Sequence, residues 1–168
     1  GIGAGVEIAE DGIRFYRNGH LRAVDLETGV FPSFSTDWHP PLAVLLTQAS
    51  GRSRIHETVF DDRLVYAEAL RHMGARIETS RRCLGHGPCR FAGSGHTHSV
   101  TIDGPTVLRG IETTVPDLRA GFSQIMAAIA AEGRTVINGA SVIDRGYEQI
   151  EKALNDLGST SIPLLAIF

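Results

Sequence analysis

Two carboxylates and three arginines stand at matching places in this chain and could together handle an anionic substrate. Asp37 lies in "STDWHPPL", and Asp117 lies eighty residues later in "VPDLRAGF". A positioned carboxylate can act as a general base toward a hydroxyl group. The arginines are Arg119, Arg145 in "DRGYE" and Arg63 in "DDR". Their planar guanidinium groups fit phosphate and carboxylate oxygens, so this set of residues suits proton abstraction beside a bound anion.

Each of these residues also has a purely structural interpretation. Asp37 and Asp117 could be acids at helix starts, where they satisfy free N–H groups and complement the helix dipole. Arg119 and Arg145 could be surface arginines that pair with a neighbouring aspartate. Arg63 occupies the position equivalent to Arg145 in an internal repeat and could be only a remnant of that repeat. The residue types alone leave both interpretations open.

An internal repeat contains the elements that would position these residues. The stretch "STDWHPPLAVLLTQASGRSRIHE" aligns with "VPDLRAGFSQIMAAIAAEGRTVING". In both copies apolar residues recur at the spacing of an amphipathic helix. The two stripes are Trp38, Leu42, Leu45, Leu46 and Ala49 in the first copy and Leu118, Phe122, Ile125, Met126 and Ile129 in the second. We therefore expect these stripes, and the aromatic rings of Trp38 and Phe122, to lie in the core.

The rest of each repeat follows the same order of elements. After the first helix, each copy predicts a strand, a second helix and another strand, at 53–57, 65–73 and 76–79 and again at 135–138, 147–157 and 160–165. Gly51 and Gly133 are expected to end the first helices, and Gly74 and Gly158 the second. The opening "VEIAEDGIRFYR" predicts a hairpin that turns at Asp11-Gly12.

These repeats predict an α/β fold in which helices form a shared core and sheets cover it. The chain opens on what resembles the closing strands of a unit whose helices are absent. We therefore expect one domain over residues 1–168 with an incomplete first unit. This domain would be a fragment, or a domain whose first unit is completed elsewhere in a longer protein.

Composition excludes several classes of partner. The net charge is −3, with no basic tract, so nucleic acid and anionic membranes are not expected partners. No apolar run approaches the roughly 20 residues of a membrane span. Two cysteines do not make a disulfide framework, which favours reduced thiols and a cytoplasmic location.

The segment "CLGHGPCRFAGSGHTH" contains residue types that could bind zinc. They are Cys83, His86, Cys89, His96 and His98. Their C-x5-C and H-x-H spacings differ from the usual pattern of zinc sites, and the segment is rich in glycine. A solvated loop with reduced thiols is therefore favoured, and no metal is expected.

Six pieces of the sequence, in this order, resemble the enolpyruvyl transferases. They are "STDWHPPL", "HETVFDDR", "MGARIE", "PDLRAGF", "AEGRTVI" and "DRGYEQIEKAL". The resemblance covers residues 24–162. It is to the branch of the family that acts on UDP-N-acetylglucosamine. It implies a two-domain enzyme in which each domain is an inside-out α/β barrel of three repeated units. This chain resembles the second, C-terminal domain, without the domain that carries the mobile catalytic loop and the reactive cysteine.

The resemblance also implies a reaction and the residues that serve it. The enolpyruvyl group of phosphoenolpyruvate would move to the 3-hydroxyl of UDP-N-acetylglucosamine in bacterial peptidoglycan synthesis. Asp37 would be the base, and Asp117 would lie close to the reacting carbons. No cofactor is implied, because carboxylates and arginines suffice for addition and elimination. Substrate-binding roles are implied for Arg119, Arg145, the backbone of Val59 and Phe60, and Arg63.

Without its other domain, the chain is expected to be inactive. The face that would meet that domain could then drive self-association. Two other hypotheses remain. The chain could be a non-catalytic module that binds a nucleotide sugar or an anion, or a small metal-binding domain built on the Cys/His segment.

Overall fold

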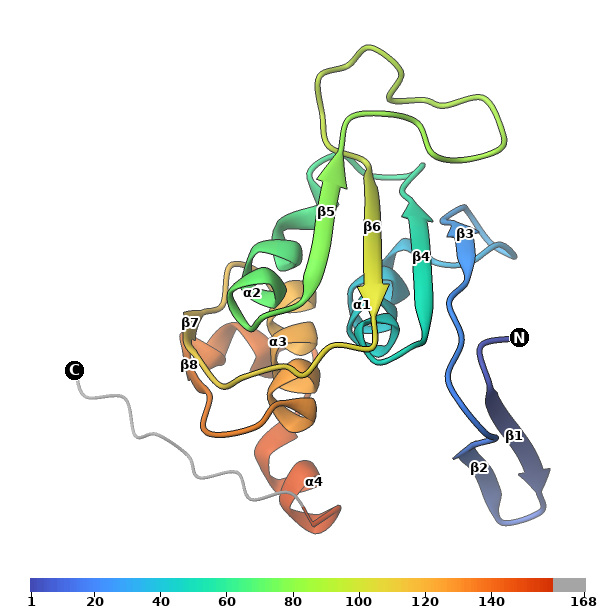
Figure 1. The fold of residues 1–168 in the computed structure, drawn as a ribbon. Coiled ribbons are helices and arrows are strands. Elements are labelled where there is room, and N and C mark those ends of the chain that lie inside the picture. Colours follow the sequence, from blue (N-terminus) through green and yellow to red (C-terminus); the bar gives the residue numbers. More distant parts are fainter. Residues whose placement is uncertain (159–168) are drawn as a thin grey trace.

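A four-stranded sheet backed by helices forms the centre of the computed structural model, which describes residues 1–158 (Figure 1). The sheet has the order β3 (Asp25–Glu27), β4 (Gly51–His56), β6 (Ser99–Gly104) and β5 (Arg76–Ser80). Helix α1 (His39–Thr47) packs on β4 and β6, and α2 (Tyr66–His72) packs on β5. Helix α3 (Leu118–Ala130) contacts α1 and α2. The helices thus form an inner layer that the sheet covers from one side.

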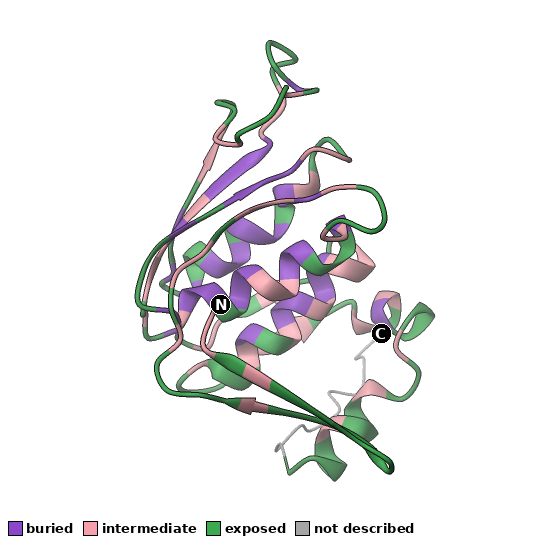
Figure 2. Ribbon diagram, turned by 90° about the vertical axis from the view of Figure 1, so that its right-hand side faces the viewer, coloured by how far each residue is buried: buried purple, intermediate pink, exposed green. Residues whose placement is uncertain are grey.

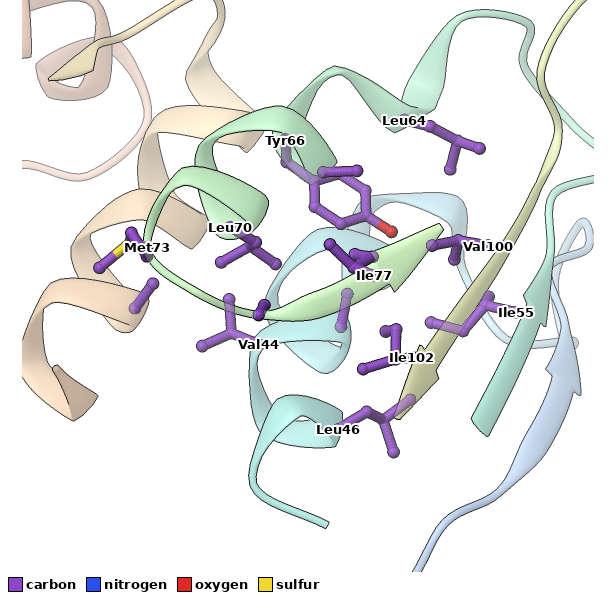
Figure 3. Close-up of a cluster of buried hydrophobic side chains, with 14 of the residues drawn as sticks. Val44, Leu46, Ile55, Leu64, Tyr66, Leu70, Met73, Ile77, Val100 and Ile102 are labelled. Atoms are coloured by element: carbon purple, nitrogen blue, oxygen red, sulfur yellow. The ribbon is translucent and has the colours of Figure 1, made fainter. Parts of the chain in front are cut away.

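The register of this sheet directs alternate side chains into the core. Strand β6 runs antiparallel to β4 and β5, with Ile55 opposite Val100 and Ile77 opposite Ile102. Because side chains alternate between the faces of a sheet, all four of these residues project toward the helices. They meet Leu46 of α1 and residues of α2 in one buried cluster (Figure 3).

The internal repeat is confirmed. In the first copy, parallel strands β3 and β4 flank α1, and the 3-10 helix η2 (Arg63–Val65) leads into α2. The second copy has parallel strands β7 (Glu112–Thr114) and β8 (Val136–Asn138) around α3, then η3 (Ala140–Arg145) and α4 (Ile150–Asp156). Strands β3 and β7 were not predicted, since three residues are too few to show a periodic pattern. The closing strand expected at 160–165 lies outside the described residues.

The prediction that the apolar stripes of the first helix in each repeat lie in the core is partly wrong. Trp38 is 63% exposed, Leu45 38%, Met126 37% and Ile129 52%. Phe122 is half-buried and stacks on Tyr147. Instead, α3 buries a strip of small and polar residues: Ala120, Gly121, Ser123, Gln124 and Ala127. Small side chains let helices pack closely, so α3 lies against α1 and α2 with this face and leaves much of its larger apolar side uncovered.

Two of the four predicted helix ends are correct. Gly74 and Gly158 follow the last residues of α2 and α4 with positive φ angles of 97° and 88°. By contrast, α1 ends at Thr47 and α3 at Ala130, so Gly51 and Gly133 lie beyond those ends. None of the helices within residues 1–158 is both long and apolar enough to cross a membrane.

The N-terminal hairpin is confirmed, but its turn is shifted by one residue. Strands β1 (Ala4–Ala9) and β2 (Gly12–Arg17) pair with Ala9 opposite Gly12, so the turn is Glu10-Asp11. Figure 2 shows this hairpin as mostly exposed. One of its faces carries four apolar side chains that are 56–82% exposed: Val6, Ile8, Ile13 and Phe15. No other element of the described chain covers this apolar face.

The loop between β5 and β6, residues 81–98, is not simply solvated. Cys83 and Cys89 form a disulfide-bonded pair whose Cα atoms are 6.1 Å apart. Phe91 is only 7% exposed, and His98 is fully buried. The expectation of reduced thiols in a solvated loop is therefore wrong for this structure.

Gly121 determines how closely η3 approaches α3. A Cβ atom at this position would lie 2.7 Å from Val115 Cγ1 and 2.8 Å from Ile143 Cγ1. We expect Gly121→Ala to lower the free energy of unfolding. Overpacking costs about 1–3 kcal/mol, and the better helix propensity of alanine offsets only about 1 kcal/mol.

Urea unfolding measures this effect. Gly12→Ala is the matched control, because nothing lies within 4 Å of a Cβ atom there. A Gly121→Ala protein as stable as the Gly12→Ala protein would show that η3 can move away from α3 at no cost.

Candidate active site

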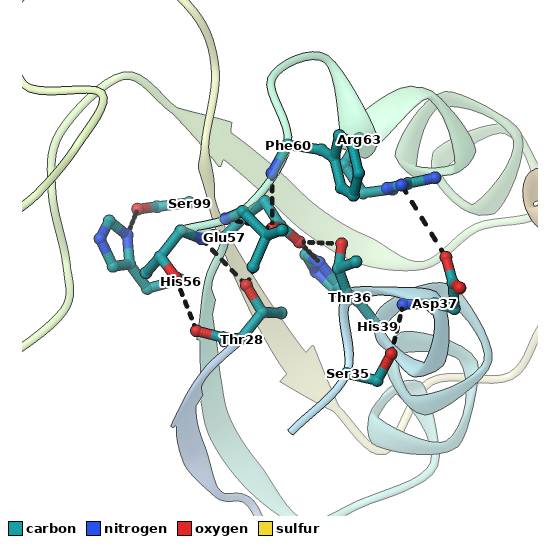
Figure 4. A network of polar contacts seen from close by, with 12 residues as sticks. Thr28, Ser35, Thr36, Asp37, His39, His56, Glu57, Phe60, Arg63 and Ser99 are labelled. Atoms are coloured by element: carbon teal, nitrogen blue, oxygen red, sulfur yellow. Dashed lines mark hydrogen bonds and ion pairs between the residues drawn. The ribbon is translucent and has the colours of Figure 1, made fainter. Parts of the chain in front are cut away.

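Asp37 lies where the two repeats meet. It belongs to the 3-10 helix η1 (Thr36–Trp38), and its N–H donates to Ser35 Oγ over 3.3 Å. Its carboxylate, 51% exposed, accepts a hydrogen bond from Arg119 Nε at the start of α3. Arg63 Nη2, from η2, lies 3.8 Å from the same carboxylate oxygen (Figure 4). The structure thus gathers one carboxylate and two guanidinium groups from three elements.

Asp117 is the N-cap of α3. This is the structural role that the sequence left open for it, an acid that satisfies free N–H groups at a helix start. Its Oδ1 accepts hydrogen bonds from the N–H groups of Arg119 (2.8 Å) and Ala120 (3.0 Å). A capping carboxylate holds the first turn of a helix in place. Asp117 therefore fixes the backbone of Arg119, whose side chain reaches Asp37. A catalytic role for Asp117 stays a prediction.

Tyr147 joins the same region and was not predicted. Its ring stacks on Phe122 with centroids 4.2 Å apart and planes 7° apart. Burial raises the pKa of the Tyr147 hydroxyl, the charge of Asp37 raises it further, and Arg119 opposes both. Arg145, two residues earlier, ends η3, is exposed, and forms no salt bridge within residues 1–158. Its guanidinium group is open to an anion from solution.

Glu57 is the centre of a buried polar network beside this cluster, drawn in Figure 4. It directly follows β4 and is fully buried. Five donors converge on its two carboxylate oxygens. They are the hydroxyls of Thr28 (2.9 Å) and Thr36 (2.8 Å), His39 Nδ1 (3.2 Å), and the N–H groups of Val59 (2.8 Å) and Phe60 (3.1 Å). Such a set of donors favours the charged carboxylate.

The protonation states in this network follow from its geometry. Burial alone would raise the pKa of Glu57, but the hydrogen bonds from His39, Thr36 and the backbone outweigh it and lower the pKa to about 2. Burial lowers the pKa of His39, although Glu57 partly opposes this. Neutral His39 donates its Nδ1 proton to Glu57, and its Nε2 accepts from the Tyr66 hydroxyl over 2.8 Å. Burial also raises the pKa of Tyr66, which stays protonated as a donor.

This network shapes the segment that includes Val59 and Phe60. The N–H groups of both residues are already engaged by Glu57, and the Val59 carbonyl accepts from Arg90 Nη1 over 2.9 Å. The Phe60 ring is half exposed, and the Arg63 guanidinium lies 4.8 Å from its centroid. The accessible group here is therefore the Phe60 ring, with the largely buried Arg63 side chain packed beside it, and not the two N–H groups.

The sequence contained a weak signal for this network. Glu57 and His39 lie within the quoted pieces "HETVFDDR" and "STDWHPPL". In the second copy, the counterpart of His39 is Arg119, and that of Glu57 is Gly139, at the same spacing that relates Arg63 to Arg145, so the buried pair occurs in one copy only. The pairing of a β4-terminal carboxylate with a helix-start histidine became visible only in the folded chain.

Comparison with known proteins decides the family. The sequence profile of EPSP synthase (3-phosphoshikimate 1-carboxyvinyltransferase) matches residues 1–154. The chain belongs to the EPSP synthase family. The resemblance to enolpyruvyl transferases is thereby confirmed, as is the α/β fold class of that family.

Two curated relatives of this EPSP synthase family member share one name. The chain is 47% identical over 159 residues to the UDP-N-acetylglucosamine 1-carboxyvinyltransferase of Protochlamydia amoebophila. The match covers 94% of this chain and 34% of the relative. The chain is 46% identical over 168 residues to the enzyme of that name from Chlamydia abortus, covering 99% of this chain and 38% of the relative. The chain thus spans little more than a third of the length of these curated relatives.

Solved structures agree with the family assignment. The enolpyruvyl transferase NikO from Streptomyces tendae superposes with a TM-score of 0.77 at 26% identity, over 94% of this chain and 33% of NikO. An EPSP synthase from Acinetobacter baumannii gives a TM-score of 0.53 at 20% identity, over 81% of this chain and 29% of that protein, and supports the fold alone.

Proposed function

We propose that this chain is part of an enzyme that transfers the enolpyruvyl group of phosphoenolpyruvate to the 3-hydroxyl of UDP-N-acetylglucosamine. The observation that carries the proposal is the convergence of Asp37, Arg119 and Arg63 from both repeats. The names of the relatives supply the substrates. The reaction would serve peptidoglycan synthesis in the bacterial cytoplasm.

Asp37 is the base in this proposal. Its carboxylate is half exposed, and two arginines and the Ser35 cap orient it, so it can accept a proton from a bound hydroxyl. The freed oxygen attacks C2 of phosphoenolpyruvate while C3 gains a proton. C3 then loses a proton as phosphate leaves C2, and the double bond forms again. Asp117 would lie beside the reacting carbons.

Arginines supply the anion contacts. Phosphoenolpyruvate carries a phosphate and a carboxylate, and both fit the fork of a guanidinium group. Arg145 is exposed and unpaired within the described chain, which suits capture of such an anion. Arg119 would supply a second positive charge. To do so, it would give up part of its contact with Asp37 and bind the substrate anion.

The uridine nucleotide would lie along the segment after β4. Glu57 holds Val59 and Phe60 by their N–H groups, so these groups shape the segment and do not face the ligand. The half-exposed Phe60 ring and the Arg63 guanidinium would make the contacts. Stacking and cation–π contacts suit a flat base.

The other two thirds of the relatives' length would complete the site. Closed sites exclude water and align the reacting atoms, which this third of the enzyme cannot do alone. The uncovered apolar side chains of the hairpin and of α1 and α3 mark where the rest of the enzyme would pack. Left uncovered, they would favour self-association of this chain.

Phosphate release from phosphoenolpyruvate in the presence of UDP-N-acetylglucosamine tests the proposal. We expect turnover by the full-length protein that contains this segment, none by this chain alone, and recovery when the chain is mixed with the remaining part. Binding of the nucleotide sugar without phosphate release by the full-length protein would favour the non-catalytic binding module instead. Normal turnover by the chain alone would overturn the proposal that the remaining part is needed to complete the site.

A further inference from the structure

The loop 81–98 brings four metal-ligating side chains together at one end of the sheet. His98, just before β6, places its Nε2 3.3 Å from Cys83 Sγ and 3.4 Å from Cys89 Sγ. His56, the last residue of β4, has a ring nitrogen within 4.8 Å of both sulfurs. Both histidines are buried, with 0% and 2% of their surface exposed. His56 comes from a different strand, so the spacing of the loop residues gave no sign of it.

The hydrogen bond on the far side of His98 defines its tautomer. Its Nδ1 lies 2.8 Å from the carbonyl oxygen of His96. A carbonyl oxygen can only accept, so Nδ1 carries the proton. In the neutral ring, Nε2 then presents a lone pair to the two sulfurs.

His56 is oriented in the same way through Ser99. The Ser99 hydroxyl donates to the Arg82 carbonyl over 2.8 Å, so its proton is already engaged. Its oxygen lies 2.8 Å from His56 Nδ1 and must accept from it. His56 therefore also carries its proton on Nδ1 and leaves Nε2 as a lone pair. Histidine ligands of metals are typically held by such a hydrogen bond from the other ring nitrogen.

No proton is available among the groups that meet here. The sulfurs of a disulfide carry no hydrogen, so in that form the buried Nε2 of His98 faces two atoms that cannot donate to it. A buried acceptor without a donor costs free energy. Once the disulfide is reduced, two thiolates and the two imidazole rings could instead share one cation, which would satisfy all four groups at once.

We propose that Cys83, Cys89, His98 and His56 bind one zinc ion when the cysteines are reduced. A thiol reductant supplies two electrons and two protons to open the disulfide, and the two thiols release two protons when they bind Zn²⁺. Zn–N bonds of about 2.0–2.1 Å and Zn–S bonds of about 2.3 Å place tetrahedral N and S ligands about 3.6 Å apart, close to the observed contacts of His98. Four protein ligands make the site structural, with no position open for substrate.

The zinc ion would fasten the loop over the end of the sheet. Phe91 covers His98 with ring centroids 5.7 Å apart, and Gly85 lies so close to His56 that an added Cβ would be 2.3 Å from its Cδ2. Arg90 of the same loop holds the Val59 carbonyl. The remaining loop histidines are not ligands: His96 lies 3.8 Å from Asp61 and 3.5 Å from Asp62, and His86 is exposed.

Metal content of the protein, purified with zinc under reducing conditions, tests the proposal. We expect one zinc per chain, and after exchange with Co²⁺ the visible absorption bands of a tetrahedral thiolate site. Cys83→Ser and His56→Ala should lose the metal, whereas His86→Ala and His96→Ala should keep it. Ser99→Ala retains all four ligands but loses the hydrogen bond to His56, so zinc affinity should fall by about 10–100-fold.

Thermal unfolding separates loss of the site from loss of the fold. A chelator should lower the Tm of the reduced wild type and leave the Tm of Cys83→Ser unchanged. The proposal is overturned if the reduced protein contains no stoichiometric zinc or if Cys83→Ser binds as much zinc as the wild type. It is also overturned if mass spectrometry finds the disulfide intact under the same reducing conditions.

Discussion

Replacing Asp37 with asparagine in the full-length protein should lower kcat by about a hundredfold or more, the usual contribution of a general base. The amide has the size of the carboxylate but cannot take the proton of the attacking hydroxyl. The Asp37 carboxylate is 51% exposed, as is much of Arg119, and Arg63 lies as far as 3.8 Å away, so loss of these contacts should cost at most about 1 kcal/mol of stability. Steady-state phosphate release and urea unfolding measure the two effects separately.

Asp103→Asn is the matched control for this variant. Asp103 is also an exposed carboxylate paired with an arginine, at 2.8 Å and 2.9 Å from two nitrogens of Arg52, but it lies on β6 away from the cluster. This control should leave kcat unchanged. An equal loss of turnover in the two variants, or an unfolded Asp37→Asn protein with normal residual turnover, would return Asp37 to a structural role.

Replacing Glu57 with glutamine should lower the free energy of unfolding by about 3–5 kcal/mol, the scale for breaking a buried charged network. The carboxylate accepts hydrogen bonds from five donors. In glutamine an NH₂ group replaces one oxygen, and this group cannot accept the hydrogen bonds that the oxygen received. Urea unfolding at neutral pH measures the change. Glu78→Gln, an exposed position on β5, is the control and should be nearly neutral.

The same carboxylate predicts a specific loss of stability in acid. The pKa of Glu57 is lowered from 4.5 to about 2 in the folded protein. Because the pKa is lower in the folded than in the unfolded protein, ionised Glu57 stabilises the fold above pH 4.5. This stabilisation is lost as the pH falls from about 4.5 to about 2. A difference of about 2.5 units corresponds to about 3 kcal/mol.

Unfolding measured across this pH range checks the sign and the size. The wild type and Glu78→Gln should lose this stability together, whereas Glu57→Gln should lose about 3 kcal/mol less over the same range. If the free energy of unfolding fell equally with decreasing pH in the wild type and in Glu57→Gln, Glu57 would not titrate as its hydrogen bonds imply.

The sequence by itself determined the repeat, most elements and the residues of the Asp37 cluster. Helix spacing predicted α1 and α3, the glycines after α2 and α4 marked their ends, and the matching positions of Asp37 and Asp117 singled out the two helix starts that the hydrogen bond from Arg119 to Asp37 joins. The helices and their ends depend on residues within a turn or two of one another, and the repeat is the recurrence of such local patterns. Such local preferences are already present in the sequence pattern.

Only the tertiary structure decided which surfaces meet. Helix α3 buries its small residues, because close approach to α1 and α2 gains more contact than the larger side chains of its other face could make there. His39 meets Glu57 across 18 residues, and His56 meets His98 across 42. Neither pair follows from any spacing along the chain. Such contacts depend on how the sheet register and the helix packing bring distant segments together, and these are properties of the whole fold rather than of any one stretch of sequence.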